Sequence, residues 1–171
     1  MPRDRLRKLA SRIDTLIEKD DLLARRAQEI SGLRQRAALE LHGICSVFVS
    51  SINTLLQKTK LEIDPAVYAP DSFRESGANV FQINVRGRIV MIEFSAPDEL
   101  VTTENFRVPY VLEGAVRCFN QELLERERIE EQLLFFCLEK HRNAWRFFDA
   151  RTYHSGLFDQ EYLVALMERL V

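Results

Sequence analysis

The chain has 171 residues, of which 46% are hydrophobic and 29% are charged, and its formal net charge is −2. This composition excludes a wholly disordered chain, because it supplies enough apolar side chains for a folded core. The small net charge excludes a general attraction to nucleic acid or to anionic membrane, so any such attraction must come from a local patch.

The first twelve residues form such a patch, with a net charge of +4 that leaves −6 for the rest of the chain. Basic side chains on one segment can bind the phosphates of nucleic acid. The alternative is a solvated helix end, which the closely following Asp14, Asp20 and Asp21 favour. We therefore treat nucleic-acid binding as the second function to consider, and its candidate contacts are Arg3, Arg5, Arg7, Lys8 and Arg12.

Residues 1–62 are predicted to form one long helix with a coiled-coil repeat. Heptads counted from Leu6 place a positions at every seventh residue to Leu55, and d positions at every seventh residue from Leu9 to Ser51. Twelve of these fifteen positions are apolar, which is typical of a coiled coil. The expected association residues are Leu9, Ile13, Leu16, Leu23, Ile30 and Leu41.

Two kinds of residue interrupt this pattern. Asp20 and Arg34 occupy a positions, where a polar residue either fixes register and partner number or marks a point at which the seam faces water. Gly32 and Gly43 predict a kink or a helical hairpin near either position. The almost uncharged residues 44–56 are expected to pack on a globular domain, and the preceding part of the helix is expected to meet a partner.

Residues 63–78 are predicted to be a linker because Pro65 and Pro70 end the helical pattern. Residues 79–95 then predict two strands joined by a tight turn at Arg86-Gly87. Residues 109–128 predict a helix with proline in its first turn and apolar residues at helical spacing.

A second hairpin around residues 141–143 and a final helix over residues 160–170, capped by Asp159, complete the chain. Phe94-x-Ala96 and Phe148-x-Ala150 have the same spacing, which indicates a repeated unit. The predicted fold class is α+β, with residues 79–171 forming a four-stranded antiparallel sheet built from two ββα units with helices packed on one face.

The other face of this sheet is expected to be apolar in the second hairpin, where it would carry Phe135, Cys137, Trp145 and Phe147. Such a surface needs a cover. Residues 44–56 are the favoured cover, and a second chain or a client protein is the alternative.

Four potentially reactive residues lie close together in FFDARTYHSGLFD, residues 147–159: Asp149, Arg151, Tyr153 and His154. An enzyme would need these side chains to converge on a concave pocket. Their counterparts in the first predicted unit are not reactive, which favours a connection or a recognition loop over catalysis. No phosphate-binding glycine loop or metal-ligand spacing occurs, so we expect no metal, no cofactor and no catalytic residue.

Cys45, Cys118 and Cys137 are an odd number of widely separated cysteines with apolar neighbours, which predicts reduced thiols in the core of a cytoplasmic protein. No signal peptide or membrane-spanning run is expected.

The leading hypothesis is a non-enzymatic interaction or assembly subunit, held through the heptad helix to a protein partner or in a homo-oligomer, with a dimer as the expected form. The alternation of helices and hairpins is similar to that of small bacterial secretion chaperones, without a shared motif. This likeness implies that a client-binding, chaperone-like role on the α+β domain is one form of the hypothesis.

Overall fold

The computed structural model describes residues 2–98, 101–102, 108–120 and 130–171. The chain divides into two compact units, residues 1–33 and residues 34–171. The elements are, in chain order, α1 (Pro2–Asn53), β1 (Glu62–Asp64), the 3-10 helix η1 (Pro70–Ser72), β2 (Asn79–Val85), β3 (Arg88–Ser95), β4 (Val101–Thr102), β5 (Pro109–Phe119), β6 (Glu130–Cys137), β7 (Ala144–Asp149), β8 (His154–Leu157) and α3 (Gln160–Leu170).

Helix α1 contains the first unit and enters the second, and it remains helical at both Gly32 and Gly43. It ends at Asn53, whose side-chain amide binds the backbone of Leu61. The Asn53 Nδ2 donates to the Leu61 carbonyl at 3.0 Å, and the Asn53 Oδ1 accepts from the Leu61 amide at 2.7 Å. The side chain thus satisfies both backbone groups of a buried residue just after the helix end.

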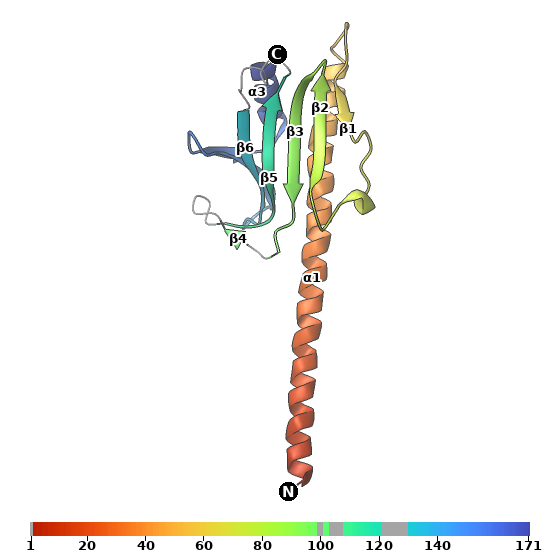
Figure 1. The fold of residues 1–171 in the computed structure, drawn as a ribbon, viewed down its shortest axis with the longest axis vertical. Helices are drawn as coiled ribbons and strands as arrows, with labels where there is room; N and C mark the ends of the chain where they lie inside the picture. The colour runs from red at the N-terminus through yellow and green to blue at the C-terminus, as the bar shows by residue number, and fades with distance from the viewer. Residues whose placement is uncertain (1, 99–100, 103–107, 121–129) are drawn as a thin grey trace. The chain divides into compact units, whose positions relative to one another are not determined.

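The strands of the second unit form one antiparallel sheet in the order β1-β2-β3-β5-β6-β7-β8, with the short β4 paired to β5 off this path (Figure 1). Both predicted hairpins are confirmed as β2–β3 and β6–β7. At the first turn Arg86 has a φ of 51° and Gly87 a φ of 87°, which is the pair of left-handed residues that a two-residue hairpin loop needs.

The predicted four-stranded sheet of two ββα units is wrong, because residues 109–119 form strand β5 between β3 and β6 and not a helix. The apolar pairs Val111-Leu112 and Ala115-Val116 imitate helical spacing. They arise because β5 is buried on both faces and because its pairing with β6 shifts register between Tyr110 and Leu112. Residues 121–128 of the expected helix lie outside the described residues.

Gly114 allows β5 to pass close to β3. A Cβ at Gly114 would lie 1.9 Å from the Glu93 carbonyl oxygen and 2.7 Å from the Phe94 Cα, distances that no side chain tolerates. Glycine is therefore required at this point of the sheet, as at other close approaches of two backbones.

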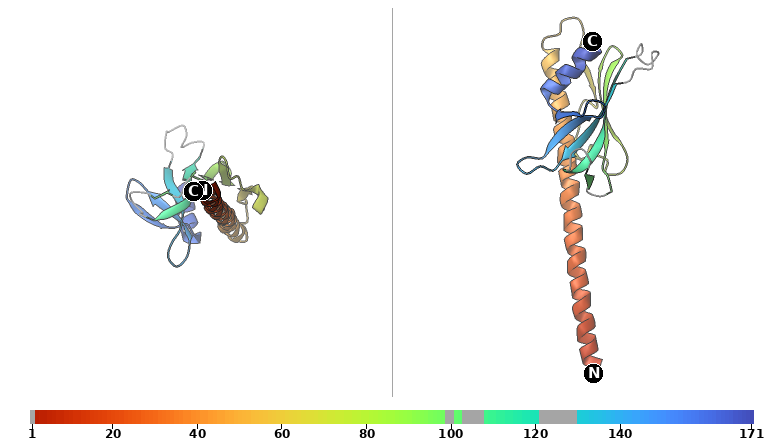
Figure 2. Two further views of the ribbon diagram at one scale, coloured as in Figure 1. Left: turned by 90° about the horizontal axis from the view of Figure 1, so that it is seen from below. Right: turned by 90° about the vertical axis from the view of Figure 1, so that its left-hand side faces the viewer.

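Residues 34–53 of α1 and helix α3 cover the same face of the sheet (Figure 2, right), and Gln160 Nε2 donates to the Ile44 carbonyl at 2.9 Å between them. Trp145 reaches α1 from β7, where its Nε1 donates to the Ala37 carbonyl at 2.8 Å. The sheet face that carries the buried residues of the first hairpin is covered by α1, in place of the helix predicted over residues 109–128. The sheet contributes to this core Phe81, Ile83, Val90, Ile92, Phe94, Leu112, Val116, Leu134 and Phe136, and α1 contributes Ala37, Ala38, Leu41, Cys45 and Phe48.

The prediction for the other sheet face is wrong for two of its four residues. The register pairs Leu134 with Phe147 and Phe136 with Trp145, so Trp145 and Phe147 lie on the α1 side. The three-residue turn expected at residues 141–143 implied a strand pairing that differs by three residues from the observed one. A shift by an odd number of residues moves each side chain of a strand to the other face of the sheet. Phe135 and Cys137 remain on the outer face, where they form a buried cluster with Tyr110 and Phe148. Helix α1 packs on the opposite face, so residues 44–56 are not the cover of this cluster.

Candidate interaction surface

The N-terminal part of α1 exposes a row of apolar side chains. Their exposed fractions run from 49% at Ile13 to 63% at Leu6. A regular row of exposed leucines is uncommon on the surface of a folded domain. We call this row the heptad seam; it consists of Leu6, Leu9, Ile13, Leu16 and Leu23.

The heptad pattern continues beyond the seam but serves another purpose there. Ile30 is half-buried, and Leu41 is fully buried against the sheet. Leu41 was expected to take part in association, and the structure places it in the core of the second unit. We therefore leave Leu41 out of the heptad seam.

Arg34 marks the change from the exposed to the buried part of the pattern. Its guanidinium is buried and donates to the Val111 carbonyl at 2.9 Å and to the Pro97 carbonyl at 2.7 Å. It also donates to Glu75 Oε1 at 2.8 Å. Neither of the two roles considered for a polar a residue applies, because Arg34 anchors α1 to three other segments of its own unit.

One side of the heptad seam is bordered by basic residues. They occupy the g positions of four successive heptads, next to the d-position leucines, and all are exposed. We call them the basic row: Arg5, Arg12, Lys19 and Arg26. Asp20 is exposed within the seam itself, at the a position between Ile13 and Ala27. The e positions on the other side of the seam are Arg3, Ala10, Ile17 and Ala24, so this edge carries one cation at its start and no charge after it.

The five basic residues proposed for nucleic acid are also exposed. Helical spacing distributes them around the helix, because Arg3 and Arg7 are one turn apart on one side and Arg5 and Arg12 are two turns apart on another. Arg5 and Arg12 belong to the basic row. The basic patch of residues 1–12 therefore does not present all five charges to one surface.

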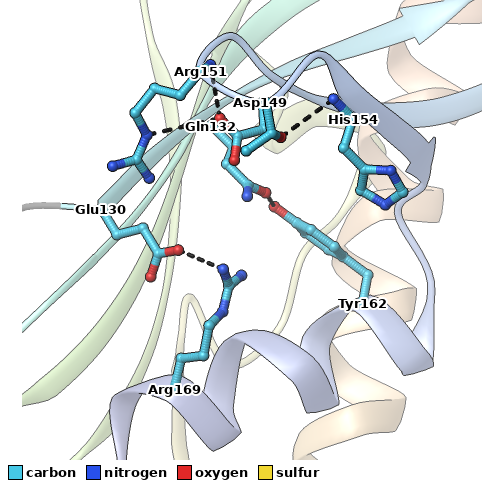
Figure 3. A network of polar contacts seen from close by, with 8 residues as sticks. Glu130, Gln132, Asp149, Arg151, His154, Tyr162 and Arg169 are labelled. Carbon is cyan, nitrogen blue, oxygen red and sulfur yellow. Dashed lines mark hydrogen bonds and ion pairs between the residues drawn. The ribbon is translucent and has the colours of Figure 1, made fainter.

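The reactive-looking residues of 147–159 form a turn at the end of β7. Asp149 Oδ1 accepts from the Arg151 backbone amide at 2.9 Å, and this hydrogen bond is the main cause that lowers the pKa of Asp149. Tyr153 is 76% exposed and adopts a left-handed φ of 58°. Arg151 Nε lies 3.8 Å from Asp149 Oδ1, but the His154 side chain points away from Arg151 (Figure 3), so the four side chains do not converge on one point.

Beside this turn, one buried and one exposed polar contact connect β6 to α3. Tyr162 donates its hydroxyl to Gln132 Oε1 at 2.5 Å, and Arg169 binds Glu130 Oε1 at 2.5 Å (Figure 3). Burial raises the pKa of Tyr162, so its hydroxyl stays protonated. These contacts connect α3 to the sheet.

A cavity of about 640 Å³ lies between α1, the β6–β7 connection and the start of α3, with Gly43, Val47 and Trp145 among its lining residues. A Cβ at Gly43 would meet no atom within 4 Å, so the cavity leaves this part of the α1 backbone open. At its rim Arg146 pairs with Glu139, and Arg142 lies 3.8 Å from Glu40. Because both arginines have acidic partners, the charges at the rim do not favour a ligand of either sign of charge.

No group of three or more His, Cys, Asp or Glu side chains in the part of the chain that the structure describes could hold a metal ion. All three cysteines are free and buried, as predicted. No described helix has both the length and the apolar character needed to cross a bilayer.

No protein family, curated protein or solved structure matches the chain significantly. The likeness to secretion chaperones rested on an alternation of helices and hairpins that strand β5 removes. Sequence reasoning located the heptad seam, and the same heptad numbering could have revealed the basic row.

Proposed function

We propose that this protein is a non-enzymatic interaction subunit that binds a protein partner through the heptad seam. The main support for this proposal is the exposure of the seam. Its leucine and isoleucine side chains are about half exposed or more, although they repeat with coiled-coil spacing. Fully burying one such side chain contributes about 1.5–3 kcal/mol. A helix that covers all five could therefore offset the entropy lost on association.

A comparison of the two parts of α1 supports this proposal. Where the apolar pattern continues past Arg34 within α1, Leu41 and Phe48 pack on the sheet and are buried. The same pattern at Leu9 and Leu16 leaves side chains that are more than half exposed in the described part of the chain. A regular pattern without a cover is best explained by a partner supplied from outside.

The test is the size of the complex that the tagged full chain forms, both purified at micromolar concentration and in cell extract. We expect a mass above that of the monomer in at least one condition. Leu9→Ser, Leu16→Ser and Leu23→Ser together should reduce it to the monomer, with little loss of stability because these sites are exposed.

The matched control removes three other exposed apolar side chains with the variant Leu55→Ser, Val67→Ser and Val171→Ser. These residues are between 74% and 83% exposed and lie outside the seam. The control should form the same complex as the wild-type chain. A wild-type chain that stays monomeric in both conditions, or a control that dissociates as fully as the seam variant, contradicts the proposal.

Nucleic-acid binding is the second candidate, and the observation in its favour is electrostatic. Four of the basic residues lie within the first two turns of α1, where the helix dipole disfavours positive charge and only Asp4 is acidic in the first turn. Replacing Arg3, Arg5, Arg7, Lys8 and Arg12 by Gln should then abolish a salt-sensitive binding to duplex DNA or RNA. Binding that survives these five substitutions removes this candidate.

A further inference from the structure

The charges along the heptad seam restrict which helix can cover it, and this inference rests on the proposed function. In a two-stranded coiled coil the residues at e and g face the partner across the edges of the seam, and they select partner and orientation. In this chain the g edge carries four cations, Arg5, Arg12, Lys19 and Arg26, while the e edge carries one, Arg3, followed by the uncharged Ala10, Ile17 and Ala24. The two edges therefore place different demands on a partner.

An antiparallel pair of two identical chains brings the g edges together. The four cations of the basic row would then face the four cations of the second copy. Like charges in such facing positions are unfavourable, and all four cations of the basic row are exposed. A self-pair in this orientation is disfavoured.

A parallel pair of two identical chains avoids that repulsion but creates another. Each g position would face an e position of the second copy, so Arg12 and Lys19 would lie opposite Ile17 and Ala24 without forming ion pairs. In register, the a positions would also meet, and Asp20 would face Asp20 of the second copy within the seam. Two carboxylates that share an apolar site oppose one another's ionisation.

We propose that the seam is covered by an amphipathic helix of a different protein, with acidic residues along the edge that meets the basic row. Such a helix would pair its carboxylates with Arg5, Arg12, Lys19 and Arg26 and its apolar residues with the seam. It would present a cation or a hydrogen-bond donor to Asp20. Attraction to the acidic helix and repulsion of a second copy together give the specificity.

The test uses the full chain and two designed four-heptad peptides, both with Leu at a and d. One carries Glu at every e and g position, and the other carries Lys there. Binding is followed by fluorescence anisotropy of labelled peptide, and the mass of the unliganded chain is measured by sedimentation. We expect a monomer that binds the Glu peptide at least about tenfold more tightly than the Lys peptide.

Charge reversal of the basic row should invert this preference. The variant Arg12→Glu, Lys19→Glu and Arg26→Glu should bind the Lys peptide more tightly than the Glu peptide. The matched control Arg7→Glu, Lys8→Glu and Arg25→Glu makes the same change in net charge on the same segment, but at positions that do not border the seam. Its preference should remain with the Glu peptide.

The possible failures separate the two proposals. A stable dimer of the wild-type chain, or equal binding of both peptides, overturns the acidic partner helix and leaves a role in association standing. Inversion by the control as complete as by the row variant also overturns it, because bulk charge then explains the preference. If neither peptide binds and the Leu9, Leu16 and Leu23 variant forms the same assemblies as wild type, the proposed function fails as well.

Discussion

At the scale of single residues, Arg34 determines how the heptad pattern is used. It occupies a position that a leucine would fill in a coiled coil, yet its three donors reach carbonyl and carboxylate oxygens on three other segments. A buried guanidinium is tolerated when such acceptors replace its water. Arg34 therefore separates the heptads that pack on the sheet from those whose apolar side chains are exposed.

Replacing Arg34 by Met should lower the free energy of unfolding by about 2–4 kcal/mol. The larger part of this loss comes from the Val111 and Pro97 carbonyls, because Glu75 is 47% exposed and can return to water. Urea denaturation followed by Trp145 fluorescence measures the change. Arg36→Met, at an exposed position on the same helix, should leave the stability nearly unchanged; an equal loss in both variants would contradict this account.

The three cysteines allow a prediction about alkaline pH. Burial raises the pKa of Cys45 and Cys118 to about 12 and that of Cys137 to about 11, from an ordinary value of 9.0. The folded state therefore favours the neutral thiol. The contribution of the buried thiols to stability is complete below about pH 9. It is lost as the pH rises toward the folded-state pKa values, because the thiols of the unfolded chain ionise at lower pH.

We expect a melting temperature that is steady near pH 8 and falls between pH 9 and pH 11, with the buried Tyr162 hydroxyl adding a loss of the same sign. Cys45→Ala should weaken this pH dependence. At pH 8 a thiol reagent should label none of the three cysteines in the folded chain and all three in denaturant. Rapid labelling of the folded chain would show that the thiols are accessible.

At the scale of elements, strand β5 shows where sequence patterns mislead. Its residues are apolar at 111, 112, 115 and 116, which is the spacing of a helix face, and its proline occupies a favoured position at a helix start. The hairpins were predictable because their turn residues and alternation are local. Whether residues 109–119 form a strand depends on β3 and β6, which lie on either side of β5 and pair with its backbone.

Two glycine variants test the roles of β5 and α1 in opposite directions. Gly114→Ala should destabilise the chain by about 3 kcal/mol, because its Cβ overlaps the Glu93 backbone and overpacking forces strands apart. Gly43→Ala should stabilise it by up to about 1 kcal/mol, because alanine favours the helix and the new Cβ meets no atom within 4 Å. Thermal melts followed by circular dichroism measure both, and equal signs for the two variants would contradict the packing described.

At the scale of the whole molecule, the division between the units falls between Leu33 and Arg34, within α1. The second unit includes residues 34–53 of the helix, and these residues contribute Leu41 and Phe48 to the core. The division expected from sequence placed the whole helix in a separate region ending at residue 62. The buried residues of α1 indicate that the sheet needs this part of the helix to be stable.

A fragment of residues 34–171 should therefore unfold cooperatively on heating, with a melting temperature close to that of the full chain. A fragment of residues 63–171 should not, because it exposes the sheet face that holds Phe81, Ile92 and Phe136. Circular dichroism and light scattering of the two fragments make the comparison. Cooperative unfolding of the shorter fragment would show that α1 is dispensable for the core.

Sequence reasoning alone identified the parts of this protein whose causes are local. Heptad spacing predicted α1, the Arg86-Gly87 turn predicted the β2–β3 hairpin, and Asp159 was recognised as the cap of α3, where its Oδ1 accepts from the Tyr162 amide at 3.0 Å. The heptad seam was also readable, since its periodicity does not depend on the rest of the fold. The tertiary structure decided which heptads are free, because only contacts between distant segments could bury Leu41, anchor Arg34 and turn residues 109–119 into a strand.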